Sequence, residues 1–385
     1  MVVVSSFARF HADRLASQMA RLRSLSCVYT SYPRPFAGVP REQISTIPGL
    51  FPLSYAVERV WPALAGRVSR VCSRAYDHIV ARALLACPGH ARGRVLHAWA
   101  TFSLTTLHAA RRTGLLTFLE SSCPHPRPRG RLLREEASRM GERWTTAPGW
   151  EETICAEFEA ADYVVVPSAY TYRSFVEERF PAEKLVQVPL GVDLKEAPVD
   201  LPPKPSRFTV LMVGTDPVRK GAYYLLRAWK LLRIPDATLV IRSGIPRAAR
   251  ELAAGPNVEC IPPVSRKELL ALYRRATVFC FPSVDDGFGL VVLEAMAHGL
   301  PVIVTPHVGA ADVVRSGVDG FIVPIRDPEA LAERIEFFYR NRDAVETLGR
   351  NARERAQAYS WDRYGEAILA NYMAALDGRA LRLPQ

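Results

Sequence analysis

The sequence predicts an α/β protein built from two doubly wound domains, and three observations lead to this fold class. The chain has 385 residues, whereas an ordinary domain has roughly 100 to 200. Short β-rich runs alternate with longer stretches whose apolar residues recur every three or four positions, as in βαβ units with a parallel sheet. A proline-rich segment, 196–206, then divides this alternation into two parts.

The first part alternates strand and helix candidates from its beginning. The strand candidates are Val2 to Val4, Ser26 to Thr30, Val95 to Trp99, Leu115 to Leu119, Tyr163 to Pro167 and Val186 to Pro189. The helix candidates are Arg9 to Arg23, Ser54 to Arg74, Thr101 to Arg112, Leu132 to Arg143, Trp150 to Ala160 and Ala169 to Arg179. We therefore expect residues 1–195 to form the first domain.

The segment from Glu196 to Ser206 holds four prolines and cannot enter a helix or a central strand. It is the predicted linker to a second domain, 207–360. The strand candidates there are Phe208 to Val213, Thr238 to Arg242, Val258 to Ile261, Val278 to Phe281 and Pro301 to Val304. The chain is expected to end in helices at Pro328 to Arg340, Arg342 to Tyr359 and Trp361 to Leu376.

The net charge of +11 is concentrated near the start of the chain. Residues 1–134 contain 19 arginines, no lysine and five acidic residues, a net charge of +14. A basic region of this kind suits an anionic partner, either a membrane surface or a phosphorylated substrate, and a plain solvated surface is the alternative. No zinc finger, RNP-like strand or aromatic-rich basic ribbon indicates nucleic acid.

The sequence also suggests where the protein acts. Its apolar runs are far shorter than the roughly 20 residues of a membrane helix, and the first residues lack a basic start and a cleavage site. The seven cysteines, at positions 27, 72, 87, 123, 155, 260 and 280, show no C-x-x-C pair or metal-ligand spacing. We therefore expect reduced thiols, no metal and a cytoplasmic protein, with peripheral contact at the inner membrane face as an option.

The first chemical motif follows the strand Phe208 to Val213. The loop starts at Gly214 and Thr215 and continues through Arg219, Lys220 and Gly221 into a helix. Backbone amides and the dipole at a helix N-terminus favour phosphate, and the two cations add direct charge pairing. A solvated turn with capping glycines is the alternative interpretation.

The second motif, from Pro282 to Pro301, also joins a strand to a helix. Asp286 is suited to accept hydrogen bonds from sugar hydroxyls, and Glu294, inside the helix, to hold the vicinal hydroxyls of a ribose. The alternatives are a capping acid with an exposed glutamate, or a metal site at Asp285 and Asp286, for which no further ligands are visible.

The same motif provides backbone groups for a phosphate. The amides of Phe288, Gly289 and Leu290 lie at the expected helix N-terminus, where anions bind. Gly287 and Gly289 allow a ligand to approach the backbone closely. The two motifs together predict a nucleotide-diphosphate site in the second domain.

At this point the chain resembles glycosyltransferase family 4, the group 1 retaining enzymes of the GT-B fold. The family signature acid-G-F-G-x-x-x-x-E begins at Asp286 and ends at Glu294, and A-M-A-x-G-x-P-V-I follows it. The similarity runs from about residue 162 to 361. Other matching pieces are Ala161-Asp162, Pro167-Ser168, Pro189 to Asp193, Lys220-Gly221, Gly317 to Phe321 and Pro324.

The resemblance implies two Rossmann-like domains that face a central cleft, with segment 361–385 crossing back to the first domain. It implies a nucleotide-sugar donor whose diphosphate meets Arg219 and Lys220, whose sugar meets Asp286 and whose ribose meets Glu294. It also implies transfer with retention, no required metal or other cofactor, and a glycan or lipid-phosphate acceptor on the first domain. Polysaccharide or glycolipid synthesis is the expected setting.

The sequence departs from the family pattern in three places. Asp286 stands where the family usually has glutamate, and Thr215 where an arginine often follows the glycine. The glycine-rich loop expected after the first strand is replaced by residues 5–11. The acceptor side is therefore less defined than the donor side.

Candidates for the acceptor side come from the first domain. His125 is the candidate for the histidine that faces the transferred sugar in similar enzymes, and a loop histidine without a role is the alternative. The further candidates for acceptor binding are Ser6, His11, Glu120, Ser122, Arg127, Arg129 and Arg131. A solvated basic loop is the alternative for the three arginines.

Three other functions remain open at this stage. A sugar phosphorylase or epimerase uses related architecture, and a nucleotide-sugar-binding scaffold would be consistent with the absent glycine loop. A dinucleotide-dependent oxidoreductase is disfavoured because no G-x-G-x-x-G follows a strand.

Overall fold

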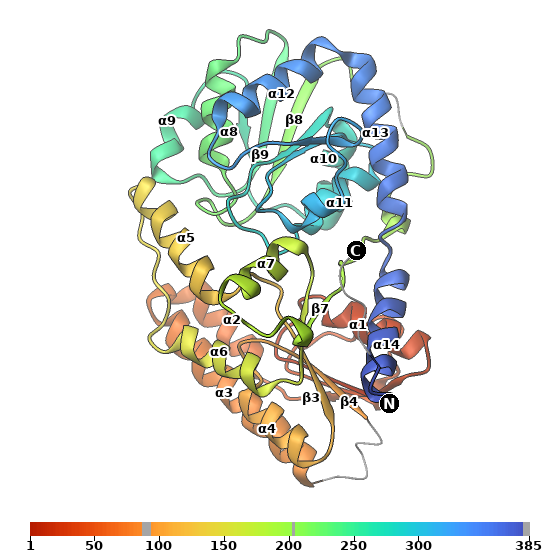
Figure 1. Ribbon diagram of the computed structural model, residues 1–385. Coiled ribbons are helices and arrows are strands. Elements are labelled where there is room, and N and C mark those ends of the chain that lie inside the picture. Colours follow the sequence, from red (N-terminus) through yellow and green to blue (C-terminus); the bar gives the residue numbers. More distant parts are fainter. Residues whose placement is uncertain (87–93, 202–204, 380–385) are drawn as a thin grey trace.

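The computed structural model describes residues 1–86, 94–201 and 205–379. Two parallel sheets, each covered by helices, are stacked along the length of the molecule (Figure 1). The strand order is β3-β2-β1-β4-β5-β6-β7 in the N-terminal sheet and β10-β9-β8-β11-β12-β13 in the C-terminal sheet. Both orders reverse beside the first strand, between β1 and β4 and between β8 and β11. In open α/β sheets, ligands bind outside the carboxyl ends of the strands at such a point.

The N-terminal domain alternates strands and helices. Its strands are β1 (Val2–Ser6), β2 (Leu25–Thr30), β3 (Ile44–Thr46), β4 (Val95–Trp99), β5 (Leu116–Glu120), β6 (Tyr163–Val166) and β7 (Leu185–Gln187). Its helices are α1 (Ala12–Arg21), α2 (Leu50–Val60), α3 (Pro62–Ala86), α4 (Leu104–Arg112), α5 (Pro126–Arg139), α6 (Trp150–Ala160) and α7 (Ala169–Glu177). The strands β1, β4 and β6 are almost entirely buried, as expected for strands covered on both faces.

The C-terminal domain repeats the arrangement. Its strands are β8 (Phe208–Val213), β9 (Ala237–Arg242), β10 (Val258–Cys260), β11 (Val278–Phe281), β12 (Val302–Val304) and β13 (Gly320–Ile322). The helices that follow are α8 (Ala222–Leu231), α9 (Arg250–Ala253), α10 (Arg266–Arg275), α11 (Leu290–Ala297), α12 (Pro328–Arg340), α13 (Arg342–Gln357) and α14 (Trp361–Leu376).

The predicted α/β class is confirmed, whereas two helix predictions were wrong and two strands were missed. The stretch expected as one helix from Ser54 to Arg74 is two helices, because the chain turns at Trp61 and α3 begins at Pro62. Helix α5 begins at Pro126, six residues before the predicted start, because a proline in the first turn is compatible with a helix. The short edge strands β3 and β13 were not predicted.

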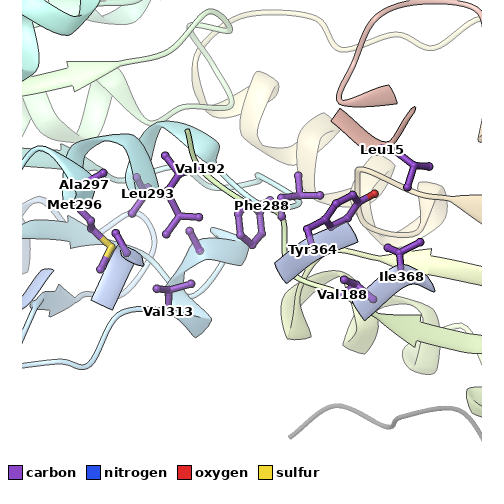
Figure 2. Packing of buried hydrophobic residues seen from close by; sticks show 14 of the residues in the cluster. Leu15, Val188, Val192, Phe288, Leu293, Met296, Ala297, Val313, Tyr364 and Ile368 are labelled. Atoms are coloured by element: carbon purple, nitrogen blue, oxygen red, sulfur yellow. The ribbon is translucent and has the colours of Figure 1, made fainter. Parts of the chain in front are cut away.

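A hydrophobic cluster joins the two domains and the last helix. Phe288 and Leu293 of the C-terminal domain, Leu15 of α1 and Tyr364 and Ile368 of α14 all belong to it (Figure 2). Helix α14 packs against α1. The chain therefore crosses between the domains twice.

The two crossings are hydrogen-bonded to each other. The amide of Val192 donates to the carbonyl of Tyr359 at 2.8 Å, and Val192 forms an isolated bridge with Ser360. A Cβ on Gly191 would lie 2.4 Å from the amide nitrogen of Trp361. Only glycine allows the two segments to approach this closely.

Six cysteines lie among the described residues, and all six are free thiols. Cys87 lies outside the described residues.

Candidate functional site

The loop between β8 and α8 is held in a fixed shape by its own residues. One carboxylate oxygen of Asp216 accepts hydrogen bonds from the amides of Val218, at 3.1 Å, and Arg219, at 2.9 Å. Gly221 has a φ of 76°, and a Cβ there would lie 2.0 Å from the carbonyl oxygen of Pro282. The loop therefore needs glycine at this position and presents Arg219 and Lys220 toward the loop after β11.

The loop between β11 and α11 is anchored to the segment that follows β12. The amide of Asp286 donates to the carbonyl of His307, and the amide of Gly309 donates to the carbonyl of Asp286, both at 2.9 Å. Gly289 has a φ of 84° and precedes the first residue of α11. This conformation favours glycine, and it aims the N-terminus of α11 into the cleft.

Lys220 and Asp286 form an ion pair where these two loops meet. Lys220 is 5% exposed, and its ammonium lies 5.4 Å from the centre of the Phe281 ring. Burial alone would raise the pKa of Asp286, but the charges of Lys220 and Arg219 outweigh it and hold the pKa below its usual value. The carboxylate therefore stays ionised, with the charges of Lys220 and Arg219 nearby.

The neighbouring Asp285 is fully buried and joins the two domains. It accepts a hydrogen bond from Nε of Arg129 at 2.9 Å and one from the hydroxyl of Tyr170 at 3.2 Å, both on the N-terminal domain. Arg219 of the C-terminal domain lies 3.6 Å from the same carboxylate. Asp285 is thus a contact between the domains.

The three arginines of α5 that were predicted to bind an acceptor all have carboxylate partners within the chain. Arg129 is paired with Asp285, whereas Arg127 and Arg131 both pair with Glu178, at 3.7 and 2.8 Å. The largely buried Arg129 is committed to the contact between the domains, whereas the side chains of Arg127 and Arg131 remain more than half exposed. Arg127 and Arg131 therefore stay candidates for an acceptor phosphate. The sequence could not show this, because the partners lie far along the chain.

Glu294 projects from α11 toward the cleft between the domains. Its carboxylate accepts a hydrogen bond from the hydroxyl of Tyr273 at 2.9 Å and pairs with Arg266 at 2.8 Å. Burial raises its pKa, and the charge of Arg266 offsets part of that effect. The sequence analysis did not find Tyr273 and Arg266, although both lie on the single helix α10.

A cavity of about 360 Å³ opens in front of Glu294. Residues of both domains line this cavity. The C-terminal domain contributes Arg266, Leu290 and Glu294, and the first loop and α1 of the N-terminal domain contribute Arg9, Phe10, His11, Asp13 and Arg14. The segments that cross between the domains add Gly191, Val192, Asp193, Glu196 and Trp361. His11 was a predicted site residue, and the structure places it in the same cavity as Glu294.

His11 is fixed by a buried polar cluster beneath the cavity. Glu120 contacts Nε2 of His11 at 2.5 Å and Nε2 of His97 at 3.0 Å. The hydroxyl of Tyr364 donates to Glu120 at 3.1 Å, and the hydroxyl of Tyr372 lies 2.6 Å from Nδ1 of His97. Burial would raise the pKa of Glu120, but the histidines reverse this and hold it well below its usual value.

This cluster corrects the prediction for Glu120. Its carboxylate is fully used inside the protein, so it supports His11 and does not contact an acceptor. Tyr364 and Tyr372 lie on α14, far along the chain from Glu120 and His97, so no local pattern indicated these contacts. Ser6 is also buried, and its hydroxyl donates to the carbonyl of Ala8 at 2.6 Å.

His125 does not lie with the other predicted catalytic residues. Its ring packs against Phe158 and Phe175, and its Nε2 lies 3.9 Å from the thiol of Cys155, all in the N-terminal domain. Burial lowers its pKa to about 4. No contact of His125 among the described residues involves Lys220 or the Asp286 carboxylate, so the prediction that it faces the transferred sugar has no geometric support.

Ser122 lies at the contact between the domains. A Cβ on Gly287 would lie 2.1 Å from the carbonyl oxygen of Ser122. The carbonyl of Gly287 in turn accepts a hydrogen bond from the hydroxyl of Ser168 at 2.7 Å. Gly287 thus lets the signature loop of the C-terminal domain touch the N-terminal domain.

Two further observations bound the site. Among the cavities of the described residues, one of about 590 Å³ lies between α8, α9 and the start of β10, away from Asp286 and Glu294. Within the ranges that the structure describes, no group of three or more histidine, cysteine or acidic side chains is placed to hold a metal ion.

Comparison with known proteins agrees with this geometry. Residues 195–355 match the family model described as glycosyl transferases group 1. The match lies in the C-terminal part of the chain.

Similar sequences carry the name D-inositol 3-phosphate glycosyltransferase. The protein of this name from Geodermatophilus obscurus is 34% identical over 257 residues, 60% of this chain and 56% of that protein. The one from Streptomyces griseus is 36% identical over 139 residues, 36% of this chain and 29% of that protein. The chain thus aligns with less than two thirds of the length of these relatives.

Solved structures match nearly the whole chain. Sucrose-phosphate synthase from Thermosynechococcus elongatus has a TM-score of 0.72 at 20% identity, with 98% of this chain and 100% of that chain covered. WaaG, a glycosyltransferase involved in lipopolysaccharide biosynthesis, has a TM-score of 0.67 at 17% identity, with 96% and 98% covered. At this identity the likeness shows the fold alone, and it confirms the predicted GT-B arrangement of two Rossmann-like domains.

Proposed function

We propose that this chain is a retaining glycosyltransferase of the family 4 type, which moves a sugar from a nucleoside-diphosphate donor to a glycan or lipid-linked acceptor. One observation carries the proposal: the Lys220–Asp286 ion pair lies beside the N-terminus of α11, and the same helix directs Glu294 into the cavity between the domains. Phosphate, sugar and ribose each have a suitable partner along this path.

The donor would bind with its diphosphate against the positive groups of the C-terminal domain. Lys220, Arg219 and the first amides of α11 face the place where negative charge grows as the sugar departs. These groups are fixed before the reaction, so little reorganisation is needed. We propose that these protein charges, without a metal cofactor, neutralise the leaving diphosphate.

Two carboxylates would select the sugar and the nucleoside. Asp286 is ionised and 19% exposed, so it can accept hydrogen bonds from hydroxyls of the transferred sugar. Glu294 would hold the ribose hydroxyls while Tyr273 and Arg266 fix its orientation. Departure and attack on one face of the sugar would retain the anomeric configuration.

The acceptor would enter from the N-terminal side of the cavity. Arg9 and Arg14 line this side, and each is partly exposed and paired with an aspartate, Asp13 and Asp193 respectively. Two guanidinium groups at the mouth of the cavity suit an acceptor that carries phosphate. This fits the printed name of the relatives, D-inositol 3-phosphate glycosyltransferase, and it also fits a lipid phosphate.

We place the activity in polysaccharide or glycolipid synthesis at the cytoplasmic face of a membrane. The basic N-terminal region would bring the enzyme to its acceptor there. Among the described residues, no helix is long and apolar enough to cross a bilayer, so the proposed contact is peripheral.

The test is an assay with purified protein, a panel of UDP-, GDP-, ADP- and TDP-sugars, and acceptors that include inositol phosphates and lipid phosphates. The proposal predicts release of the nucleoside diphosphate only with an acceptor present, and a product whose anomeric configuration, read by NMR, equals that of the donor. Phosphate-dependent sugar release would indicate a phosphorylase, and isomerised donor an epimerase. Donor binding without any turnover would support the scaffold.

A further inference from the structure

The helices α2 and α3 expose an unusual share of the protein's large apolar side chains. Of the fourteen that the described residues leave exposed, seven lie on these two helices and an eighth, Trp61, lies between them. The seven are Leu53, Tyr55, Val60, Leu64, Val71, Ile79 and Leu85. Val60, Trp61 and Val71 are each at least 60% exposed. Single exposed apolar residues need no explanation, but this concentration marks an interaction surface.

The outward side of α3 combines these apolar residues with arginine. Exposed residues recur there every three or four positions, the spacing of one helical face. They are Leu64, Arg67, Val71, Arg74, His78, Arg82 and Leu85, which we call the α3 face. Leu64 and Leu85 are 21 positions apart on this helix, so the face is about 32 Å long. It runs along the outer flank of the N-terminal domain (Figure 1).

The α3 face carries positive charge that no ion pair among the described residues neutralises. Arg67, Arg74 and Arg82 have no ion pair among the described residues. Asp77, the acidic residue within α3, is buried and accepts hydrogen bonds from the amides of Thr105 and Thr106 at 2.8 Å. Unpaired arginines beside exposed aliphatic and tryptophan side chains are the composition of a helix that lies on an anionic lipid surface.

Aromatic rings connect this surface to the cavity between the domains. Tyr55, exposed on α2, stacks on Phe51, with ring centres 6.2 Å apart. Phe51 contacts Phe7 at 5.9 Å, Phe7 contacts Phe102 at 5.2 Å, and Phe102 stacks with Phe10 at 6.0 Å. Phe10 is 51% exposed and lines the cavity that contains Glu294.

We propose that the α3 face, with Trp61 at its start, docks on an anionic bilayer, and that the row of aromatic rings borders the route from the bilayer to the cavity. The arginines would meet lipid phosphates while Trp61, Leu64 and Val71 enter the headgroup boundary. A nucleic acid is a poorer match because its phosphates offer nothing to the exposed aliphatic side chains. That the bilayer carries the acceptor rests on the proposed function, whereas the docking itself does not.

The test is flotation of the purified full chain with lipid vesicles, without donor or acceptor. One set of vesicles is pure phosphatidylcholine, and the other holds equal parts phosphatidylcholine and phosphatidylglycerol. The protein should float with the anionic vesicles alone and detach at high salt. The triple variant R67E/R74E/R82E should lower the partition coefficient by roughly a hundredfold, since each arginine near the surface contributes about fivefold.

Two more variants test whether binding depends on the position of the charges and on the apolar side chains. The control R250E/R274E/R275E makes the same change in net charge at exposed arginines of the C-terminal domain and should float like the wild type. The variant W61S/L64S should lower partitioning by roughly tenfold, because it removes apolar burial without touching charge. Circular dichroism confirms folding of each variant.

Three outcomes would overturn the proposal. The first is wild-type protein that stays unbound with anionic vesicles, and the second is a control variant that loses as much binding as the α3 variant. The third is a chain that is dimeric by light scattering and becomes monomeric in W61S/L64S, because the face would then be covered by a second copy. Failure of the glycosyltransferase assay would leave the flotation result unaffected, so the two proposals fail separately.

Discussion

Replacing Lys220 by methionine removes the positive charge in direct contact with the Asp286 carboxylate and keeps the length of the side chain. The loss of one partner from a buried ion pair costs about 3–5 kcal/mol of unfolding free energy. Here the guanidinium of Arg219 remains nearby, and the amide of Phe288 still donates to Asp286 at 3.3 Å. We therefore expect a smaller loss, about 2–3 kcal/mol.

The effect of this replacement on turnover should be larger than its effect on stability. A fixed group that meets developing charge typically contributes about 10²–10³ in kcat, so Lys220→Met should lower kcat by that factor once the donor is saturating. The assay is release of nucleoside diphosphate under saturating donor, together with urea unfolding. Lys230→Met, at an exposed lysine in the last turn of α8, is the matched control and should change neither.

A second variant separates charge pairing from catalysis. In Lys220→Met with Asp286→Asn, no unpaired carboxylate remains, so most of the lost stability should return while turnover stays low. Turnover of Lys220→Met within threefold of the wild type would refute the role given to the ion pair. Recovery of turnover in the double variant would refute it as well.

Three other predictions follow from the site. Glu294→Gln should raise the donor KM at least tenfold with a smaller change in kcat, measured by initial rates, because the proposed ribose contact would be lost in the ground state and in the transition state alike. His125→Leu should keep kcat within threefold. Because burial lowers the pKa of His125 from 6.5 to about 4, the free energy of unfolding of the wild type should rise as the pH increases between these values. Urea titrations should show that the variant lacks about 2 kcal/mol of this rise. Gly287→Ala places a methyl group against the Ser122 carbonyl and should lower kcat/KM at least tenfold, whereas Gly66→Ala, in open space on α3, should leave it unchanged.

The proximity of the donor-side candidates could be predicted because these residues lie close together in the sequence. Asp286 and Glu294 are eight positions apart on one strand-to-helix connection, and such connections place their residues at the carboxyl edge of a parallel sheet. The same rule brings Lys220, from the neighbouring connection, to Asp286. Pattern and spacing were sufficient to predict that these residues lie close together, because the order of strands and helices in this fold determines where each connection lies.

The contacts between the domains could not be predicted in this way. Arg129 and Asp285 are 156 positions apart, and Glu120 and Tyr364 are 244 apart. No local pattern distinguishes an arginine that will find a distant carboxylate from one that stays in water. From the sequence alone Arg129 and Glu120 are therefore predicted to bind the acceptor, whereas in the folded chain both side chains are paired with other residues of the protein.

The boundaries of helices show the same limit on a smaller scale. The sequence analysis places the start of a helix at Leu132 and leaves a solvated basic loop open for the three arginines, yet α5 already begins at Pro126. Two prolines within the first turn are compatible with helix formation because the first amides have no partner inside the helix. Composition alone favoured a loop, and the position of the prolines decided the structure.

The central claim, that the C-terminal domain binds a nucleoside-diphosphate sugar, is tested most directly by thermal unfolding with UDP-, GDP-, ADP- and TDP-sugars. A ligand at about a hundred times its Kd stabilises the folded state by about 2.7 kcal/mol, which raises Tm by several degrees. One donor class should do this for the wild type and for Lys230→Met, and the shift should be largely lost in Lys220→Met and Glu294→Gln. No shift with any donor, or the same shift in all four proteins, would contradict the account.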